Sequence, residues 1–182
     1  DHEVNSVFFT DVKVPAENLI GEEGKGWTYA KFLLAHERFG IAGVGASKRQ
    51  LERLKEISKD LGDEDLIAKV SQLEIDIMAL EFTELRLLSA LEGGGNPGAE
   101  SSILKIKGTE IQQRLTELFV EAAGEFAIPY GGPDGYGSNI KPNGPEYTND
   151  ALSKYLNMRK VTIYGGSNEI QKNIISKFVL GI

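Results

Sequence analysis

The sequence contains no cysteine among its 182 residues and only two histidines, His2 and His36. The absence of cysteine excludes disulfides, thiolate nucleophiles and cysteine-ligated metals, and it suits a reducing compartment, so we expect a cytoplasmic protein. Neither histidine has a glutamate three residues before it, which excludes the paired Glu-x-x-His motifs of a di-iron bundle. We therefore expect no metal.

Long apolar runs and an excess of positive charge are also missing. No run approaches the roughly 20 apolar residues of a membrane span. The 27 acidic residues outnumber the 20 Lys and Arg, and the net charge of −7 would repel a polyanion, so we expect no nucleic acid partner. The sequence has no Walker loop and no Gly-x-Ser-x-Gly elbow, which removes two common catalytic designs.

The beginning of the chain has the composition of a β-strand. Residues 4–15 are rich in β-branched and aromatic side chains, and Pro15 ends the stretch. Because a lone strand is not stable, we expect it to be the last strand of a sheet that lies mostly elsewhere. A flexible turn at residues 21–26 follows.

Apolar residues recur at helical spacing over the rest of the chain. The pattern predicts helices over residues 27–61, 64–92, 98–127, 149–161 and 168–180. Gly40, Gly43 and Gly45 interrupt the first of these, which indicates either tight helix packing or close approach to a ligand. The segment 128–147 is rich in Gly and Pro, and we expect it to serve function, docking or disorder. The predicted fold class is all-α, an up-and-down bundle of four to five helices preceded by a short β-strand remnant.

Two features of the sequence, a Glu–Arg pair and the tail motif, are the basis of the functional hypotheses. Glu37 and Arg38 sit in the first helix just before the glycines, where charges usually form a solvated face. The tail motif, residues 162–171, places an aromatic residue and two glycines directly before an apolar helix. A helix start offers unpaired N–H groups, so this motif is suited to holding the edge of a cofactor.

Three stretches together resemble the acyl-CoA dehydrogenase family. Residues 8–21 resemble the end of the family's middle β-domain, residues 24–38 its first C-terminal helix, and residues 162–181 its last loop and helix. The resemblance implies that residues 1–24 end a β-domain and that residues 25–182 form the C-terminal helical bundle domain. Since relatives carry further domains ahead, we expect the chain to be a piece of a longer protein and to be inactive alone.

The family resemblance implies an activity. Such enzymes bind FAD and an acyl-CoA thioester, and a carboxylate removes the α-proton while hydride passes from the β-carbon to flavin N5. The resemblance implies a flavoprotein of fatty acid metabolism, with electron-transfer flavoprotein as acceptor and a homotetramer or hetero-oligomer as assembly. The alternatives are a non-catalytic or half-site subunit of a hetero-oligomer, a helical oligomerisation domain, and an oxidase that uses oxygen.

The resemblance also implies site residues. Many relatives carry the catalytic Glu directly after the tyrosine of the tail motif, where this chain has Gly165. A minority carry it on the first C-terminal helix before an arginine, which makes Glu37 the expected base. The implied substrate-binding residues are Arg38, Tyr164 and Gly165, and the implied cofactor-binding residues are Gly166, Ser167 and Glu169, with a helix N-cap as the alternative role for Ser167.

Two family features are absent from this chain. The Arg-x-x-Phe-Gly stretch that contacts FAD across a subunit interface is missing near residues 48–59. The Gly-Gly-x-Gly flavin stretch after the third helix is replaced by residues 121–126, Glu-Ala-Ala-Gly-Glu-Phe. These departures keep the half-site alternative open.

Overall fold

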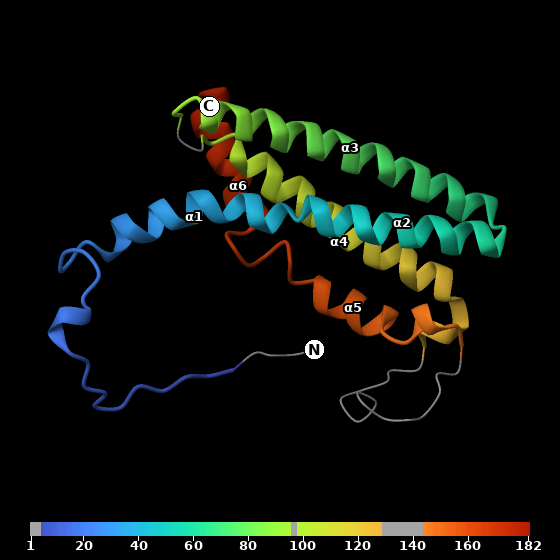
Figure 1. Ribbon diagram of the computed structural model, residues 1–182, viewed down its shortest axis with the longest axis horizontal. Coiled ribbons are helices and arrows are strands. Elements are labelled where there is room, and N and C mark those ends of the chain that lie inside the picture. Colours follow the sequence, from blue (N-terminus) through green and yellow to red (C-terminus); the bar gives the residue numbers. More distant parts are fainter. Residues whose placement is uncertain (1–4, 96–97, 129–143) are drawn as a thin grey trace.

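The computed structural model describes residues 5–95, 98–128 and 144–182. Its described residues form six α-helices: α1 (Gly26–Ala42), α2 (Val44–Leu61), α3 (Glu64–Glu92), α4 (Ser101–Ala123), α5 (Ala151–Met158) and α6 (Asn168–Ile175). Helices α2, α3 and α4 lie side by side along the long axis, and α1, α5 and α6 also pack against α4 (Figure 1). The predicted all-α bundle is confirmed.

The strand predicted over residues 4–15 is not formed. Residues 5–15 contain no assigned strand, and the large side chains of this segment, such as Phe8 and Phe9, are exposed. The segment runs as an arm outside the bundle (Figure 1). The physical reason is that strand formation requires a neighbouring strand, and none of the described residues supplies one.

The single helix predicted over residues 27–61 is divided in two. Gly43 adopts a left-handed conformation, with φ of 61°, and it ends α1 directly before α2 begins. A residue with a Cβ would be strained there, so the glycine permits the break. Gly40, in contrast, has nothing within 4 Å of the place where a Cβ would stand.

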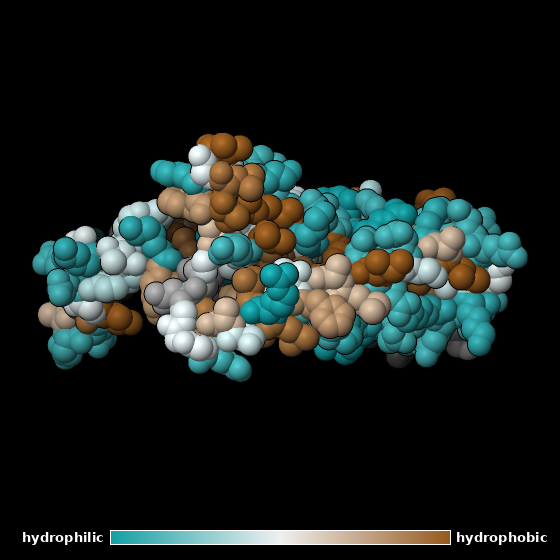
Figure 2. Space-filling model, turned by 90° about the horizontal axis from the view of Figure 1, so that it is seen from above, coloured by the Kyte–Doolittle hydropathy of each residue, from teal (hydrophilic) through white to brown (hydrophobic). Residues whose placement is uncertain are grey.

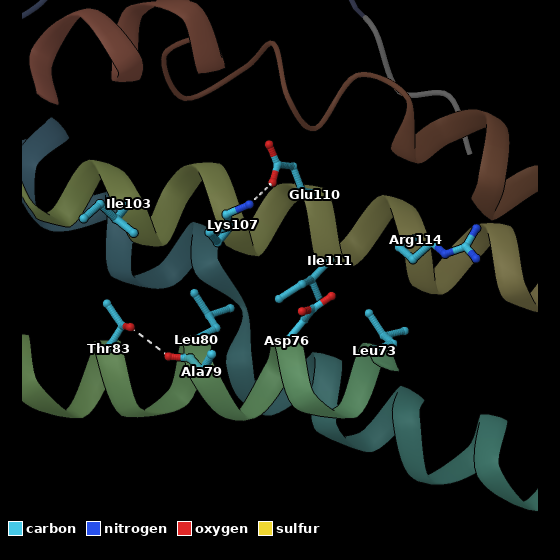
Figure 3. Close-up of a pocket in the computed structure, with 10 residues that line it drawn as sticks. All are labelled: Leu73, Asp76, Ala79, Leu80, Thr83, Ile103, Lys107, Glu110, Ile111 and Arg114. Carbon is cyan, nitrogen blue, oxygen red and sulfur yellow. Dashed lines mark hydrogen bonds and ion pairs between the residues drawn. The ribbon is translucent and has the colours of Figure 1, made fainter. Parts of the chain in front are cut away.

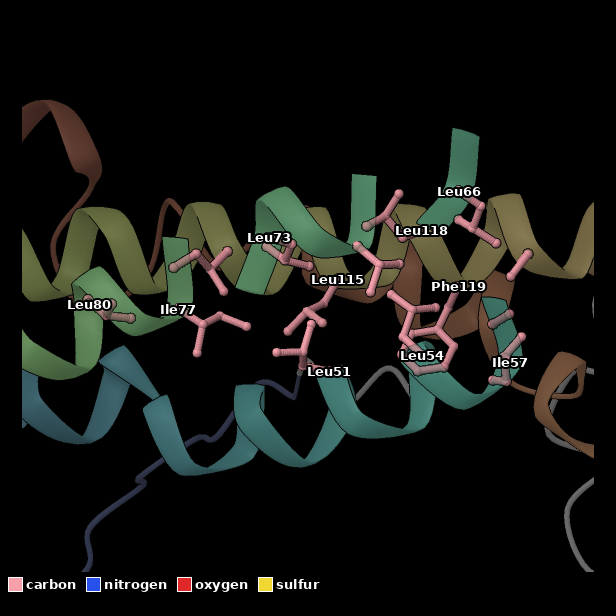
Figure 4. Packing of buried hydrophobic residues seen from close by; sticks show 14 of the residues in the cluster. Leu51, Leu54, Ile57, Leu66, Leu73, Ile77, Leu80, Leu115, Leu118 and Phe119 are labelled. Atoms are coloured by element: carbon pink, nitrogen blue, oxygen red, sulfur yellow. The ribbon is translucent and has the colours of Figure 1, made fainter. Parts of the chain in front are cut away.

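The core is formed where α2, α3 and α4 meet. The near-heptad stripe of α3 is buried against the apolar faces of α2 and α4 (Figure 4). Asp63 caps the start of α3 by accepting a hydrogen bond from the amide of Leu66 at 3.0 Å. The bounds of α3 agree with the predicted helix over 64–92 because cap, stripe and glycine stop coincide in the sequence.

The predicted third helix, 98–127, consists of α4 followed by a 3₁₀ turn, Gly124–Ala127. The last predicted helix, 168–180, consists of α6 and a π-helical turn, Ser176–Leu180. Most of the Gly- and Pro-rich segment 128–147 lies outside the described residues. No helix in the described part of the chain is long and apolar enough to cross a membrane.

Candidate functional site

Helix α4 holds the end of α1 by close contact. A Cβ built on Gly108 of α4 would lie 2.5 Å from the Cα and the carbonyl oxygen of Ala42, which is itself fully buried. One turn further along α4, Gln112 Nε2 donates to the carbonyl oxygen of Ile41 at 2.8 Å and to that of Ala42 at 3.3 Å. These bonds satisfy carbonyl groups that the end of a helix leaves without partners.

Helix α4 also holds the tail loop, which we define as residues 162–167. Gln113 Nε2 donates to the carbonyl oxygen of Met158 at 3.2 Å and lies 3.4 Å from Oγ1 of Thr162, at the loop's beginning. The amide of Asn168 donates to the carbonyl oxygen of Thr162 at 3.0 Å and closes the loop. The loop is therefore a defined turn fastened at both ends.

The tail loop contacts the end of α1. Gly165 and Gly166 both have positive φ, 65° and 83°, which a glycine adopts without strain. A Cβ on Gly165 would lie 2.5 Å from Cδ1 of Ile41, so the α1 side chain fills the space beside the loop. Glu37 precedes Ile41 by one helical turn, and side chains at this spacing share a face with Cβ atoms about 5–6 Å apart. The structure thus brings the α1 segment around Glu37 next to Gly165.

Glu37 and Arg38 have different surroundings. The Glu37 side chain is exposed, whereas Arg38 is half-buried and its Nη1 donates to Oγ of Ser101 at 3.1 Å. Burial lowers the pKa of the Arg38 guanidinium from its ordinary value. Because consecutive helix residues do not face each other, Arg38 directs its charge toward α4 and away from the Glu37 side.

Ser167 is the N-cap of α6. Its Oγ accepts a hydrogen bond from the amide of Ile170 at 3.5 Å. Glu169 is exposed, and its pKa is lowered first by a hydrogen bond from its own backbone amide, then by the Ser167 hydroxyl and the charges of Lys172 and Lys105. Two amides at this helix start are thus paired within the chain, that of Asn168 with the carbonyl oxygen of Thr162 and that of Ile170 with Ser167.

A buried polar cluster between α4 and α6 was not predicted from the sequence. Lys105 is fully buried, and its Nζ donates to Oδ1 of Asn168 at 2.9 Å. Oγ1 of Thr109 lies 3.3 Å from the same oxygen. Burial lowers the pKa of Lys105, which the negative charge of Glu169 partly opposes. The spacing in the sequence could have indicated that Lys105 is buried. Lys105 lies four residues after Ser101 and three before Gly108, so it shares the inward face of α4 with them.

The loop, rather than the helix start, fits the edge of a flat cofactor such as FAD. Tyr164 and Gly166 are exposed, and Gly166 presents backbone without a side chain. Beside the loop, Oε1 of Gln171 is buried and has no hydrogen-bond partner among the described residues. Most buried polar atoms in folded proteins are hydrogen-bonded, so this oxygen is an exception among the described residues.

Two cavities lie away from this site. One, of about 350 Å³, lies between α3 and α4 and contains none of the predicted site residues (Figure 3). Its polar groups include Lys107, which donates to Glu110 at 2.8 Å, and the pKa of Lys107 is raised mainly by this hydrogen bond. The other, of about 280 Å³, lies among α2, α4 and α5. Neither cavity includes the tail loop.

Comparison with known proteins gives a consistent result over the whole chain. The family model for the acyl-CoA dehydrogenase C-terminal domain matches residues 24–180. Acyl-CoA dehydrogenase IpdE1 of Mycobacterium tuberculosis is 32% identical over 187 aligned residues, covering 99% of this chain and 44% of that protein. Acyl-CoA dehydrogenase FadE34 of the same organism is 30% identical over 182 residues, covering 98% of this chain and 23% of that protein.

A solved structure shares the fold. The ChsE4–ChsE5 complex from Mycobacterium tuberculosis superposes with a TM-score of 0.74 at 23% identity, and the match covers 96% of this chain and 45% of that one. The chain therefore spans less than half the length of each of these proteins.

Proposed function

Because the chain belongs to the acyl-CoA dehydrogenase family through that family's C-terminal domain, we propose that it takes part in FAD-dependent α,β-dehydrogenation of an acyl-CoA thioester. In this proposal residues 1–24 end a β-domain and residues 25–182 are the helical domain that contributes the base and part of the cofactor site. FAD, when bound, would accept the hydride that leaves the β-carbon of the substrate.

The observation that carries the proposal is the contact between Ile41 and Gly165. The tail motif lacks the carboxylate that many relatives carry, and the segment of α1 that lies against this position contains Glu37 one turn away. A carboxylate on α1 therefore reaches the same region as a carboxylate on the loop. Glu37 takes the α-proton. Arg38 is bonded to Ser101 on α4 at 3.1 Å, and its proposed part in substrate binding requires that its guanidinium turn from α4 toward the loop.

The remaining roles follow from the loop. Tyr164 and the backbone at Gly165 contact the acyl-CoA, while Gly166 and Ser167 contact the cofactor. We propose that Ser167 caps α6 and also contacts the cofactor, which requires its hydroxyl proton to turn from the Glu169 carboxylate toward the cofactor. Glu169 lies at the exposed rim of the loop as a charged neighbour of the cofactor. Bound substrate and the parts of the protein that cover the loop exclude water from around Glu37.

A half-site subunit is the second candidate, and the exposed apolar surface favours it. The outer face of α3 exposes Ile75, Met78, Phe82 and Leu85, and the C-terminal segment exposes Phe178 and Leu180. Figure 2 shows apolar side chains gathered on one part of the surface seen from above, and Phe178 and Leu180 of the C-terminal segment are exposed. Exposed patches of this kind mark surfaces that another domain or subunit covers. A homotetramer or a hetero-oligomer would cover them, and electron-transfer flavoprotein would accept the electrons.

The test is Glu37→Gln in the full-length protein, with Glu56→Gln as the matched control, because Glu56 is an exposed carboxylate on α2. Removal of a general base lowers turnover by about 10²- to 10⁴-fold, and we expect this loss with acyl-CoA and a flavin-linked dye. FAD content, read from visible absorbance, stays equal in both variants. Unchanged turnover in Glu37→Gln would remove Glu37 from the mechanism. A wild-type protein that holds FAD only after mixing with a second subunit would favour the half-site candidate.

A further inference from the structure

The most unusual buried group in the described chain is the ammonium of Lys105. It is fully buried, and in the described structure it donates to a neutral amide, Oδ1 of Asn168 at 2.9 Å. The charge of Glu169 acts on the ammonium without a direct ion pair, and burying a charge that is not directly paired is costly. Several other lysines of the described chain are partly exposed and paired with carboxylates, as Lys55 is with Glu74 at 2.5 Å. The position of Lys105 therefore requires a reason beyond stability.

Asn168 is the point at which the tail loop meets α6. Its amide closes the loop by donating to the carbonyl oxygen of Thr162 at 3.0 Å, while its side chain accepts from Lys105. Gln113 fastens the beginning of the loop from two helical turns further along the same helix. The loop is thus stretched between two α4 side chains, and the bond from Lys105 is the charge-assisted one.

We propose that Lys105 is a positioning residue. It sets the conformation of the tail loop through Asn168, and thereby the surface on which the edge of the cofactor binds. This inference rests on the proposed function for its cofactor part only. A charged donor in a low-dielectric interior gives Asn168 one preferred orientation, and Asn168 in turn orients the adjacent Ser167 and Gly166. Lys105 itself does not reach the reacting atoms, because it is enclosed between α4 and α6.

The test compares Lys105→Met with Lys107→Met in the full-length protein. Met keeps the length and volume of the lysine stem, and Lys107 is the exposed lysine of the same helix, paired with Glu110. Amide hydrogen exchange of residues 163–168 is measured by mass spectrometry against peptides of α2 and α3. We expect Lys105→Met to speed exchange of the loop by about 10-fold or more, since a hydrogen bond to a charged group controls a factor of this size. Exchange in α2 and α3 stays unchanged, and Lys107→Met has no effect on the loop.

A second comparison keeps the inference testable if Lys105→Met folds poorly. Asn168→Ala removes the same bond from the other side, and the double variant should exchange no faster than the more affected single variant. Additive effects, or loop exchange in Lys105→Met equal to wild type, would overturn the proposal. FAD dissociation is followed in the same samples and should quicken in Lys105→Met. If the wild-type protein holds no FAD, the proposed function fails, and the exchange result still decides the role of Lys105.

Discussion

Replacing Gly108 by alanine tests the close approach of α1 to α4. In an ordinary helix interior this change stabilises a protein by about 1 kcal/mol, because alanine loses less conformational entropy than glycine. Here the added Cβ would lie 2.5 Å from two backbone atoms of Ala42. Backbone cannot rotate away as a side chain can, so α1 must move away from α4 to make room.

The magnitude follows from these two opposing effects. Overpacking a well-packed interface costs about 1–3 kcal/mol, and contact with backbone places Gly108→Ala at the upper end of this range. Subtracting the gain of about 1 kcal/mol in helix propensity leaves a loss of about 1–2 kcal/mol in the free energy of unfolding. Chemical denaturation followed by circular dichroism measures this loss. The displacement of α1 also moves Glu37, so turnover should fall together with stability.

The matched control is Gly45→Ala in α2. Its nearest neighbour, Nη1 of Arg49, would lie 3.9 Å from the new Cβ, and its φ is not positive. This variant should gain about 0.5–1 kcal/mol from helix propensity alone. The reasoning about the helix crossing is refuted if both glycine variants are stabilised equally, because Ala42 would then leave space for a side chain at position 108.

Two further predictions concern the tail loop and its support. Ser167→Ala removes the N-cap of α6 and should lower the free energy of unfolding by about 1 kcal/mol in a denaturation experiment. The same variant should raise the pKa of Glu169 in a titration followed by NMR, since the Ser167 hydroxyl helps to lower that pKa. The folded-state pKa of Lys105 lies below its unfolded value, so the unfolded state binds more protons. The stability of the wild-type protein relative to Lys105→Met should therefore rise with pH below the ordinary lysine pKa and level off above it. Equal unfolding free energy differences between these two proteins at neutral pH and at pH near 10 would contradict a depressed pKa for Lys105.

The elements that the sequence predicted well are those whose signals are local. Helix α3 has its cap at Asp63, its apolar stripe and its glycine stop within one stretch, and its predicted bounds agree with the structure. The break at Gly43 was missed as a boundary because the apolar pattern continues through it. The carbonyl groups freed before the break are bonded by Gln112, which lies far away in the sequence. The strand over residues 4–15 has a local pattern, but pairing is non-local and no described segment supplies it.

The candidate site shows the same division. Glu37, Arg38 and the tail loop could be singled out from the sequence as candidates because their motifs are short and continuous. Their meeting through Ile41 and Gly165 was not predictable from spacing, and neither was the burial of Lys105. A lysine is normally exposed, so only its partner Asn168, brought near by the packing of α6 on α4, reveals why it lies inside.

Under the proposed function, the contact between Ile41 and Gly165 makes a carboxylate on α1 an alternative to a carboxylate on the loop. A glutamate at position 165 would have to adopt φ of 65° and would place its Cβ 2.5 Å from Cδ1 of Ile41. A non-glycine residue in that conformation costs about 1–2 kcal/mol before any contact is counted. The glycine therefore lets the end of α1 come against the loop, and this close approach brings the segment with Glu37 to the loop's side. In this proposal the glycine at position 165 and the role of Glu37 belong to the same packing arrangement.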